Sequence, residues 1–329
     1  MFRICKVMLA TCCSSLLTAC YQDIDLDKYK GQNGENLLVI NSIVNPDSTV
    51  AVVATKTYFF SDLHTTRDYV NDLAIRLLIN GEDKGVLTYN SNSHYYESTI
   101  KPKENDYVCI ETQYGDSIIR CGNIIPPAVE IKSTEVEREG PMSIYTSNDY
   151  IVTYKVTFKD PVGKGNYYFL HYDTSNPFVG LPMGERDYSH EIVFQKLANT
   201  INSTIPGWEP YSPYGLPFTD EAIDGKTHTL ILREIVQGGN GIDLTRYNVM
   251  SRKIKLFSIS EDYYKYLLSV LYNSTEDGGL HSGMIDLGIT EPMKYFSNIK
   301  GGVGIFAGYS LSEREINVME ILGRFPSPK

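Results

Sequence analysis

The sequence predicts a mostly β protein, with an antiparallel sandwich followed by a larger β-sandwich or barrel-like domain. Three observations predict it: apolar and β-branched runs recur about every ten residues, turn-forming segments separate them, and only one segment has helical spacing. With 329 residues, the chain is long enough for two domains of ordinary size. We expect the first domain in residues 36–127 and the second in residues 128–329.

The first domain shows closely spaced strand signals. Runs of β-branched and apolar residues occupy 37–44, 48–60 and 73–81, and the segments NPDS and NGEDKG beside them are turn formers. The pair Pro126-Pro127 then ends the pattern, because proline has no N–H to donate within a central strand. We therefore place the domain boundary at these two prolines.

Two cysteines, Cys109 and Cys121, lie in a segment that reads as a β-hairpin turning around Gly115. If Gly115 is the centre, the numbers of paired residues sum to 230, as 109 and 121 do. The cysteines would then face each other at the short end of the disulfide range. Because an exported compartment permits the bond, we expect a disulfide; two buried thiols in contact are the alternative.

In the second domain, the segment YIVTYKVTFKD alternates strictly, with Val152, Tyr154, Val156 and Phe158 on one face. Further on, the glycines of GGVGIFAG lie among strand formers, and no helix pattern follows closely. We therefore expect these glycines to permit bends or close backbone approach in a closing strand, and not to bind a nucleotide.

One helix is predicted near 260–273. Ser260 can cap its first turn, and Glu261 and Asp262 suit the positive end of the helix dipole. Apolar residues then recur at helical spacing: Tyr263, Tyr264, Leu267, Leu268 and Leu271.

A long irregular stretch, roughly 174–226, interrupts the strands, and such a stretch is usually functional or mobile. Aromatic residues on such a loop can stack on sugars or anchor a protein interface. They can equally fold back over the sheet and cover the core, so both interpretations stay open. The candidate residues for contact with a ligand or partner are Trp208, Tyr211, Tyr214 and Phe218.

The first 19 residues read as a lipoprotein signal peptide. Arg3 and Lys6 give a positive start, and the apolar run that follows is too short to span a bilayer comfortably. The segment Leu17-Thr18-Ala19-Cys20 resembles the bacterial lipobox, which implies cleavage before Cys20 and acylation of that residue. Two or more acyl chains hold a protein stably on a membrane. The alternative is an ordinary secretory signal.

Residues 20–35 form an acidic tether. Its alternating acids, Asp23, Asp25 and Asp27, match the first half of a calcium loop, but the required glycine and glutamate are missing. Acids placed just after a lipidated cysteine resemble the surface-export signal of Bacteroidota lipoproteins. A plain solvated tether is the alternative.

Composition and motif content exclude several function classes. The chain has 40 acidic and 30 basic residues, a formal net charge of −10, and no basic tract, so we expect no nucleic-acid partner. Its six histidines are scattered, without an H-E-x-x-H pair, and there is no G-x-S-x-G motif. We therefore expect no enzyme activity, no metal and no cofactor.

Several stretches recur in the order found in one family. LLVINSIVNPDSTVAV, AIRLLINGEDKGVL, KPKENDYVCIET and NIIPP come first, and the most specific are SISEDYYKYLLSV and EPMKYFSNIKGGVGIFAGYS. Together they resemble Bacteroidota outer-membrane lipoproteins catalogued only as a domain of unknown function. The resemblance implies an immunoglobulin-like or transthyretin-like first domain and a β-rich second one. It also implies a role beside TonB-dependent receptors, which are often encoded next to family members, and it supplies no catalytic residues.

These observations predict an outer-membrane lipoprotein, lipid-anchored and facing outward, that works without catalysis. We expect it to bind a nutrient ligand or to dock to a TonB-dependent receptor. Two other classes stay open: a structural surface protein such as an adhesin or assembly subunit, and a hydrolase whose active site is built from distant residues.

Overall fold

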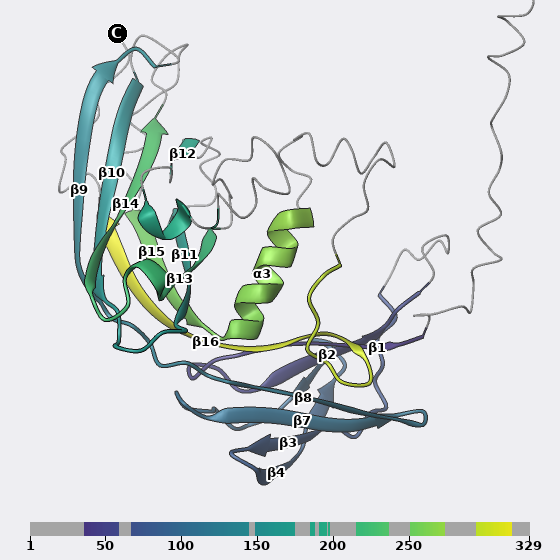
Figure 1. The fold of residues 1–329 in the computed structure, drawn as a ribbon. Helices are drawn as coiled ribbons and strands as arrows, with labels where there is room; N and C mark the ends of the chain where they lie inside the picture. The colour runs from purple at the N-terminus through teal and green to yellow at the C-terminus, as the bar shows by residue number, and fades with distance from the viewer. Residues whose placement is uncertain are drawn as a thin grey trace, which may run out of the picture.

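The computed structural model describes residues 36–58, 67–144, 149–174, 185–187, 191–195, 197, 215–236, 251–273 and 294–317. Within these residues the protein is mostly β, arranged in open sheets that pack as sandwiches, as predicted (Figure 1).

The largest sheet has eight strands and runs through both halves of the molecule. In spatial order its strands are β13 (Leu216–Thr219), β11 (Tyr167–Thr174), β15 (Ser251–Ile259), β16 (Val303–Asn317), β1 (Leu38–Val44), β2 (Ala51–Lys56), β6 (Tyr95–Glu97) and β5 (Thr88–Asn90).

Two four-stranded sheets pack against it. One contains β12 (Glu185–Asp187), β14 (Thr227–Val236), β10 (Asp149–Lys159) and β9 (Ile131–Met142). The other contains β4 (Glu82–Val86), β3 (Arg76–Ile79), β7 (Tyr107–Tyr114) and β8 (Ser117–Ile124).

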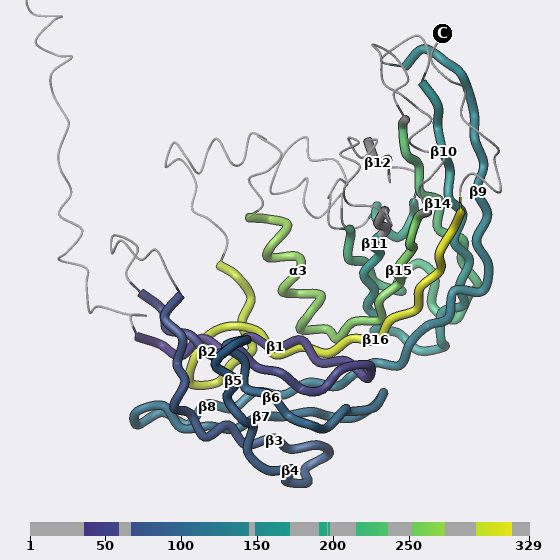
Figure 2. The backbone as a smooth tube through the Cα atoms, turned by 180° about the vertical axis from the view of Figure 1, so that it is seen from behind, coloured from purple at the N-terminus to yellow at the C-terminus, as the bar shows by residue number. Residues whose placement is uncertain are grey.

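Strand β16 joins the two halves. Its first part, Val303 to Gly308, pairs in parallel with β1, and its second part, Tyr309 to Asn317, pairs antiparallel with β15. Figures 1 and 2 show the strand passing along β1 and then rising beside β15. The parallel pair departs from the antiparallel sandwich predicted for the first half, since a strand from the far end of the chain completes it.

The buried apolar residues form two cores. The first core contains buried residues from 38–125 together with Ile299 and Phe306 of the C-terminal part. The second core contains buried residues from 129–272 together with Ile316. The alternating residues predicted on β10, Val152 to Phe158, all belong to the second core, which confirms their shared face.

The described residues include one long helix, one single helical turn, and further helical residues at 192–195 and 197. Helix α3 (Glu261–Asn273) matches the prediction, and the Tyr263 N–H donates to the Ser260 side-chain oxygen at 3.4 Å, as expected for a cap. The single turn is η2 (Asp220–Ala222). No helix in this part of the chain is long and apolar enough to cross a membrane.

The cysteine pairing predicted from the sequence is wrong by one position. Tyr114 pairs with Ser117, so the turn contains two residues, and Cys109 is opposite Gly122 while Cys121 is opposite Ile110. Because neighbouring residues of a strand point to opposite faces, the two cysteines do not face each other. Both thiols are free and buried, so the predicted disulfide is not present. Burial raises the pKa of both thiols.

Candidate functional site

Helix α3 carries apolar side chains around more than half of its circumference. At 3.6 residues per turn, the arc that runs from Tyr266 to Tyr272 spans about 240°. One side of this arc contacts the protein: Tyr272 is buried in the second core, Leu268 packs against that core, and the Tyr264 ring lies 5.1 Å from the Tyr167 ring. The other side forms what we call the second stripe of α3: Tyr263, Tyr266, Leu267, Val270 and Leu271. Of these, Leu271 also packs against the second core.

The second stripe lines a cavity of about 440 Å³ between α3 and the largest sheet, which we call the α3 cavity. Figures 1 and 2 show α3 in the angle between the two halves, with β1 and β16 below it and β11 beside it. Val270 is 37% exposed, so the stripe reaches the surface. The sheet contributes Asn41, Ile43, Phe169, Gly215, Pro217 and Ile305.

Alternation along the strands creates the sheet wall of the cavity. Ile40 is buried in the first core, so its neighbour Asn41 faces the opposite side, toward α3. Ile305 of β16 is paired with Asn41 of β1. At the other end of the wall, Phe169 of β11 is paired with Pro217 of β13.

Gly215 permits the close approach that shapes this end of the wall. Its φ is +114°, and a Cβ there would lie 2.2 Å from the backbone oxygen of Leu170 and 2.9 Å from the Phe169 ring. Only glycine fits both the backbone conformation and the space. The chain therefore enters β13 directly against β11.

Polar contacts fix the start of α3 above the sheet. The Asp262 carboxylate accepts hydrogen bonds from the side-chain amides of Asn123, at 2.9 Å, and Asn298, at 2.8 Å. Both amides also donate to the backbone oxygen of Phe306. This network ties the first turn of α3 to β8 and β16, so polar contacts outside the cavity lining hold the start of the helix.

The described lining residues of the α3 cavity are uncharged at neutral pH. Tyr263 and Tyr266 are its ionisable residues, and burial raises the pKa of Tyr263 to about 12 and also raises the pKa of Tyr266. Their hydroxyl groups therefore stay protonated at pH 7, and Asn41 adds a neutral amide. The lining offers apolar surface, aromatic rings and a few neutral hydrogen-bonding groups.

An aromatic row continues from the cavity along the same face of the sheet. The Phe169 ring lies 5.7 Å from the Phe257 ring, which lies 5.3 Å from the Tyr309 ring. His171, two residues further along β11, stacks with Phe169 at a centroid distance of 6.5 Å. All four rings are half-buried, so a ligand that extends out of the cavity would meet aromatic surface.

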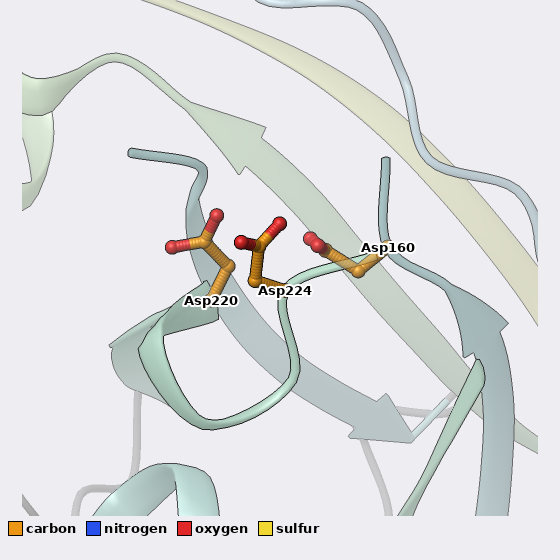
Figure 3. A group of neighbouring side chains, drawn as sticks. All are labelled: Asp160, Asp220 and Asp224. Carbon is orange, nitrogen blue, oxygen red and sulfur yellow. The ribbon is translucent and has the colours of Figure 1, made fainter. Parts of the chain in front are cut away.

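A cluster of three carboxylates lies outside the α3 cavity. Asp160 follows β10, Asp220 lies in η2, and Asp224 lies in the next turn, with one oxygen from each within 4.8 Å of the others. Figure 3 shows the Asp224 carboxylate between the other two. Oxygen ligands suit hard cations such as Ca²⁺, so these are the described residues that could hold a metal ion.

Hydrogen bonds also give this cluster a structural role. The Tyr168 hydroxyl donates to Asp160 at 2.5 Å, and the Gly225 N–H donates to the same carboxylate at 2.8 Å. Burial raises the pKa of Asp160, and the nearby charges of Asp220 and Asp224 raise it further. The cluster thereby joins the segment after β10 to the turn before β14. Further hydrogen bonds run to Asp220 from the N–H groups of Gly165 and Asn166 and from the Asn166 side-chain amide, and to Asp224 from the N–H group of Gly163.

Few of the site residues predicted from the sequence lie among the residues that the structure describes. Phe218 lies in β13, is 1% exposed and packs in the second core, so the predicted contact role is wrong for this residue. The predicted roles of the others stay predictions. Those outside the described residues are Cys20, Asp23, Asp25, Asp27, Trp208, Tyr211 and Tyr214.

The sequence did contain a signal for the α3 cavity. The second stripe begins at Tyr263 and has the spacing i, i+3, i+4, i+7 and i+8 of a complete apolar helix face. A second such face begins at Tyr264 and shares Leu267 and Leu271 with the first, whereas a helix that packs on one side needs only one apolar face. The sheet wall gives no comparable signal, because it is assembled from distant strands.

The fold and the cavity define a class: a two-core β protein with one long helix over its shared sheet. The chain belongs to the family described as a domain of unknown function (DUF4249), whose model matches residues 22–315. No curated protein and no solved structure matches the chain.

Proposed function

We propose that the protein is a non-catalytic outer-membrane lipoprotein that faces outward, binds a nutrient ligand and docks to a TonB-dependent receptor. The segment Leu17-Thr18-Ala19-Cys20 supports lipid anchoring, and the acids that follow support export to the outer face. The resemblance to Bacteroidota lipoproteins, which are often encoded beside such receptors, supports the partner.

The α3 cavity is the observation that carries the binding role. Its volume of about 440 Å³ falls within the range of small-molecule pockets, roughly 300–1,000 Å³. A mostly apolar lining with a few polar groups is typical of such sites. Its described lining residues include no histidine, cysteine, serine, carboxylate or cationic side chain, which supports binding and not catalysis.

Membrane fractionation tests the anchor. We expect Cys20→Ala to abolish membrane association, because the acyl chains are the strong membrane-binding element that the sequence predicts. Wild type should stay in carbonate-washed membranes and the variant should not. Retention of the variant would contradict lipid anchoring at Cys20.

Surface exposure depends on the acids of the tether. Replacing Asp23, Asp25 and Asp27 together with alanine should leave the protein lipidated but protected from protease added to whole cells. Equal digestion of wild type and variant would mean that these acids serve only as a tether.

Affinity capture tests the partner. The lipidated protein, cross-linked in outer membranes and captured by a C-terminal tag, should bring down a TonB-dependent receptor that mass spectrometry identifies. An unrelated lipoprotein with the same tag is the control. Equal receptor recovery from both, or none from either, would contradict docking.

A further inference from the structure

The described lining residues of the α3 cavity carry no charge, which limits what the cavity can hold. We propose that the cavity binds a neutral, largely apolar small molecule, which contacts the second stripe of α3 on one side and the sheet wall on the other. This inference rests on the proposed binding function and narrows it to one class of ligand.

A charged group would enter the cavity without a partner. None of its described lining residues is acidic or basic. Moving an ion from water into apolar surroundings is strongly unfavourable unless an opposite charge or hydrogen bonds compensate. On α3 itself, Glu261 and Lys265 are exposed and pair with each other at 2.8 Å, on the side away from the second stripe.

The polar groups of the lining suit a ligand with one or two neutral hydrogen-bonding groups. Asn41 is exposed on the sheet wall, and its amide can both donate and accept. The hydroxyls of Tyr263 and Tyr266 can do the same while they remain protonated. A hydroxyl, carbonyl or amide on an apolar body would satisfy these groups, whereas a carboxylate or ammonium would meet no opposite charge among the described lining residues.

The size of the cavity favours a compact small molecule over a folded peptide segment as its occupant. One turn of an α-helix, about 10 Å wide and 5.4 Å long, already occupies about 400 Å³. The whole cavity of about 440 Å³ therefore holds roughly one turn. A compact small molecule fits the same volume, with the second stripe of α3 on one side and the sheet wall on the other.

Two related fluorescent probes test the charge selectivity. N-phenyl-1-naphthylamine is neutral, and 1-anilinonaphthalene-8-sulfonate has the same skeleton with one added sulfonate. Both are titrated into the full chain carrying Cys20→Ala, so that neither acyl chains nor detergent compete for them. We expect saturable binding of the neutral probe and at least tenfold weaker binding of the sulfonate.

Two variants assign the binding to the α3 cavity. Ile43→Phe places a larger side chain in the sheet wall and should weaken binding of the neutral probe at least tenfold. Its control is Ile118→Phe, the same change at a residue of β8 that is 74% exposed and outside the cavity.

Val270→Lys adds a cation to the lining and should reverse the preference toward the sulfonate. Its control is Val86→Lys, at a residue of β4 that is 57% exposed. An unchanged melting temperature shows that each variant is folded.

The outcomes separate the ligand class from the binding function. The proposal is supported if the neutral probe binds more tightly and loses affinity in Ile43→Phe but not in Ile118→Phe. If the sulfonate binds wild type as tightly as the neutral probe does, and Ile43→Phe weakens both, the ligand class is overturned while the cavity remains a binding site. If neither probe binds, or if Ile43→Phe changes nothing, the binding function of the cavity is overturned as well.

Discussion

At the scale of single residues, the fold holds buried charge in two different ways. In the second core, Arg252 pairs with Glu234 at 2.9 Å, and the Tyr154 hydroxyl donates to the same carboxylate at 3.0 Å. Asp160 is also fully buried, but the described charges beside it are the carboxylates of Asp220 and Asp224. Ionising Asp160 therefore opposes folding, whereas the charge of Glu234 is compensated.

This difference predicts how stability depends on pH. The pKa of Asp160 is raised in the folded protein. Between the unfolded and the folded pKa, the folded state therefore keeps a proton that the unfolded state has lost. Asp160 therefore contributes stability below its unfolded pKa of about 4, and this contribution is lost as the pH rises through the folded pKa, by at most about 1.4 kcal/mol per pH unit. The Asp160→Asn variant lacks this titrating group. Its free energy of unfolding relative to wild type, measured by urea unfolding, should therefore increase as the pH rises from about 4 through the folded pKa of Asp160.

A second variant isolates the effect of neighbouring charge. Asp224→Asn removes one carboxylate from the cluster, so the pKa of Asp160 should rise less and the pH dependence of unfolding should weaken. A constant stability difference between Asp160→Asn and wild type from pH 4 to pH 8 would show that the Asp160 carboxyl does not titrate differently on folding.

At the scale of elements, α3 combines two apolar faces with different surroundings. Leu268 packs against the second core, whereas its neighbour Leu267 lines the α3 cavity. The first face holds the helix in the fold, together with the hydrogen bonds of Asp262. The second face therefore contributes less to stability than its composition suggests and is available for a ligand.

Two adjacent leucines measure this division. Leu268→Ala should reduce the free energy of unfolding by about 2–3 kcal/mol, because it leaves a void in packed surroundings. Leu267→Ala should cost less than half as much, because its side chain already borders a cavity, yet it should weaken binding of the neutral probe. Chemical denaturation and probe titration of both variants give the two quantities. Equal stability losses would place both residues on packed faces.

At the scale of the whole molecule, local signals predicted the fold well and long-range pairing poorly. The strict alternation from Val152 to Phe158 and the capped helix after Ser260 follow from neighbouring residues, and both are confirmed. The glycines of the closing strand also behave as predicted: a Cβ on Gly304 would lie 2.1 Å from the backbone oxygen of Ile40.

The features that the sequence did not predict depend on contacts between distant residues. No local pattern indicates that β16 pairs in parallel with β1, or that Phe306 completes the first core. The hairpin register depended on whether the turn holds one or two residues, and one residue of error reversed the faces of Cys109 and Cys121. The α3 cavity likewise needs strands from both ends of the chain.

Because β16 belongs to both cores, we expect the two halves to unfold together. Phe306→Ala in the first core and Ile316→Ala in the second should each shift a single cooperative transition, with the phenylalanine change costing about 3–5 kcal/mol. Circular dichroism and hydrogen exchange of both variants would check this. Two separate transitions, each sensitive to only one variant, would mean that the cores are independent.

Native mass spectrometry tests most directly the central claim that the α3 cavity is a ligand site. The wild-type protein and the variants Ile43→Phe and Ile118→Phe are each produced in the native host, purified from its outer membrane and measured without denaturation. We predict a bound neutral small molecule on wild type and on Ile118→Phe, and its absence from Ile43→Phe. The same bound species in equal proportion on wild type and Ile43→Phe, or no bound species on wild type, would contradict the claim.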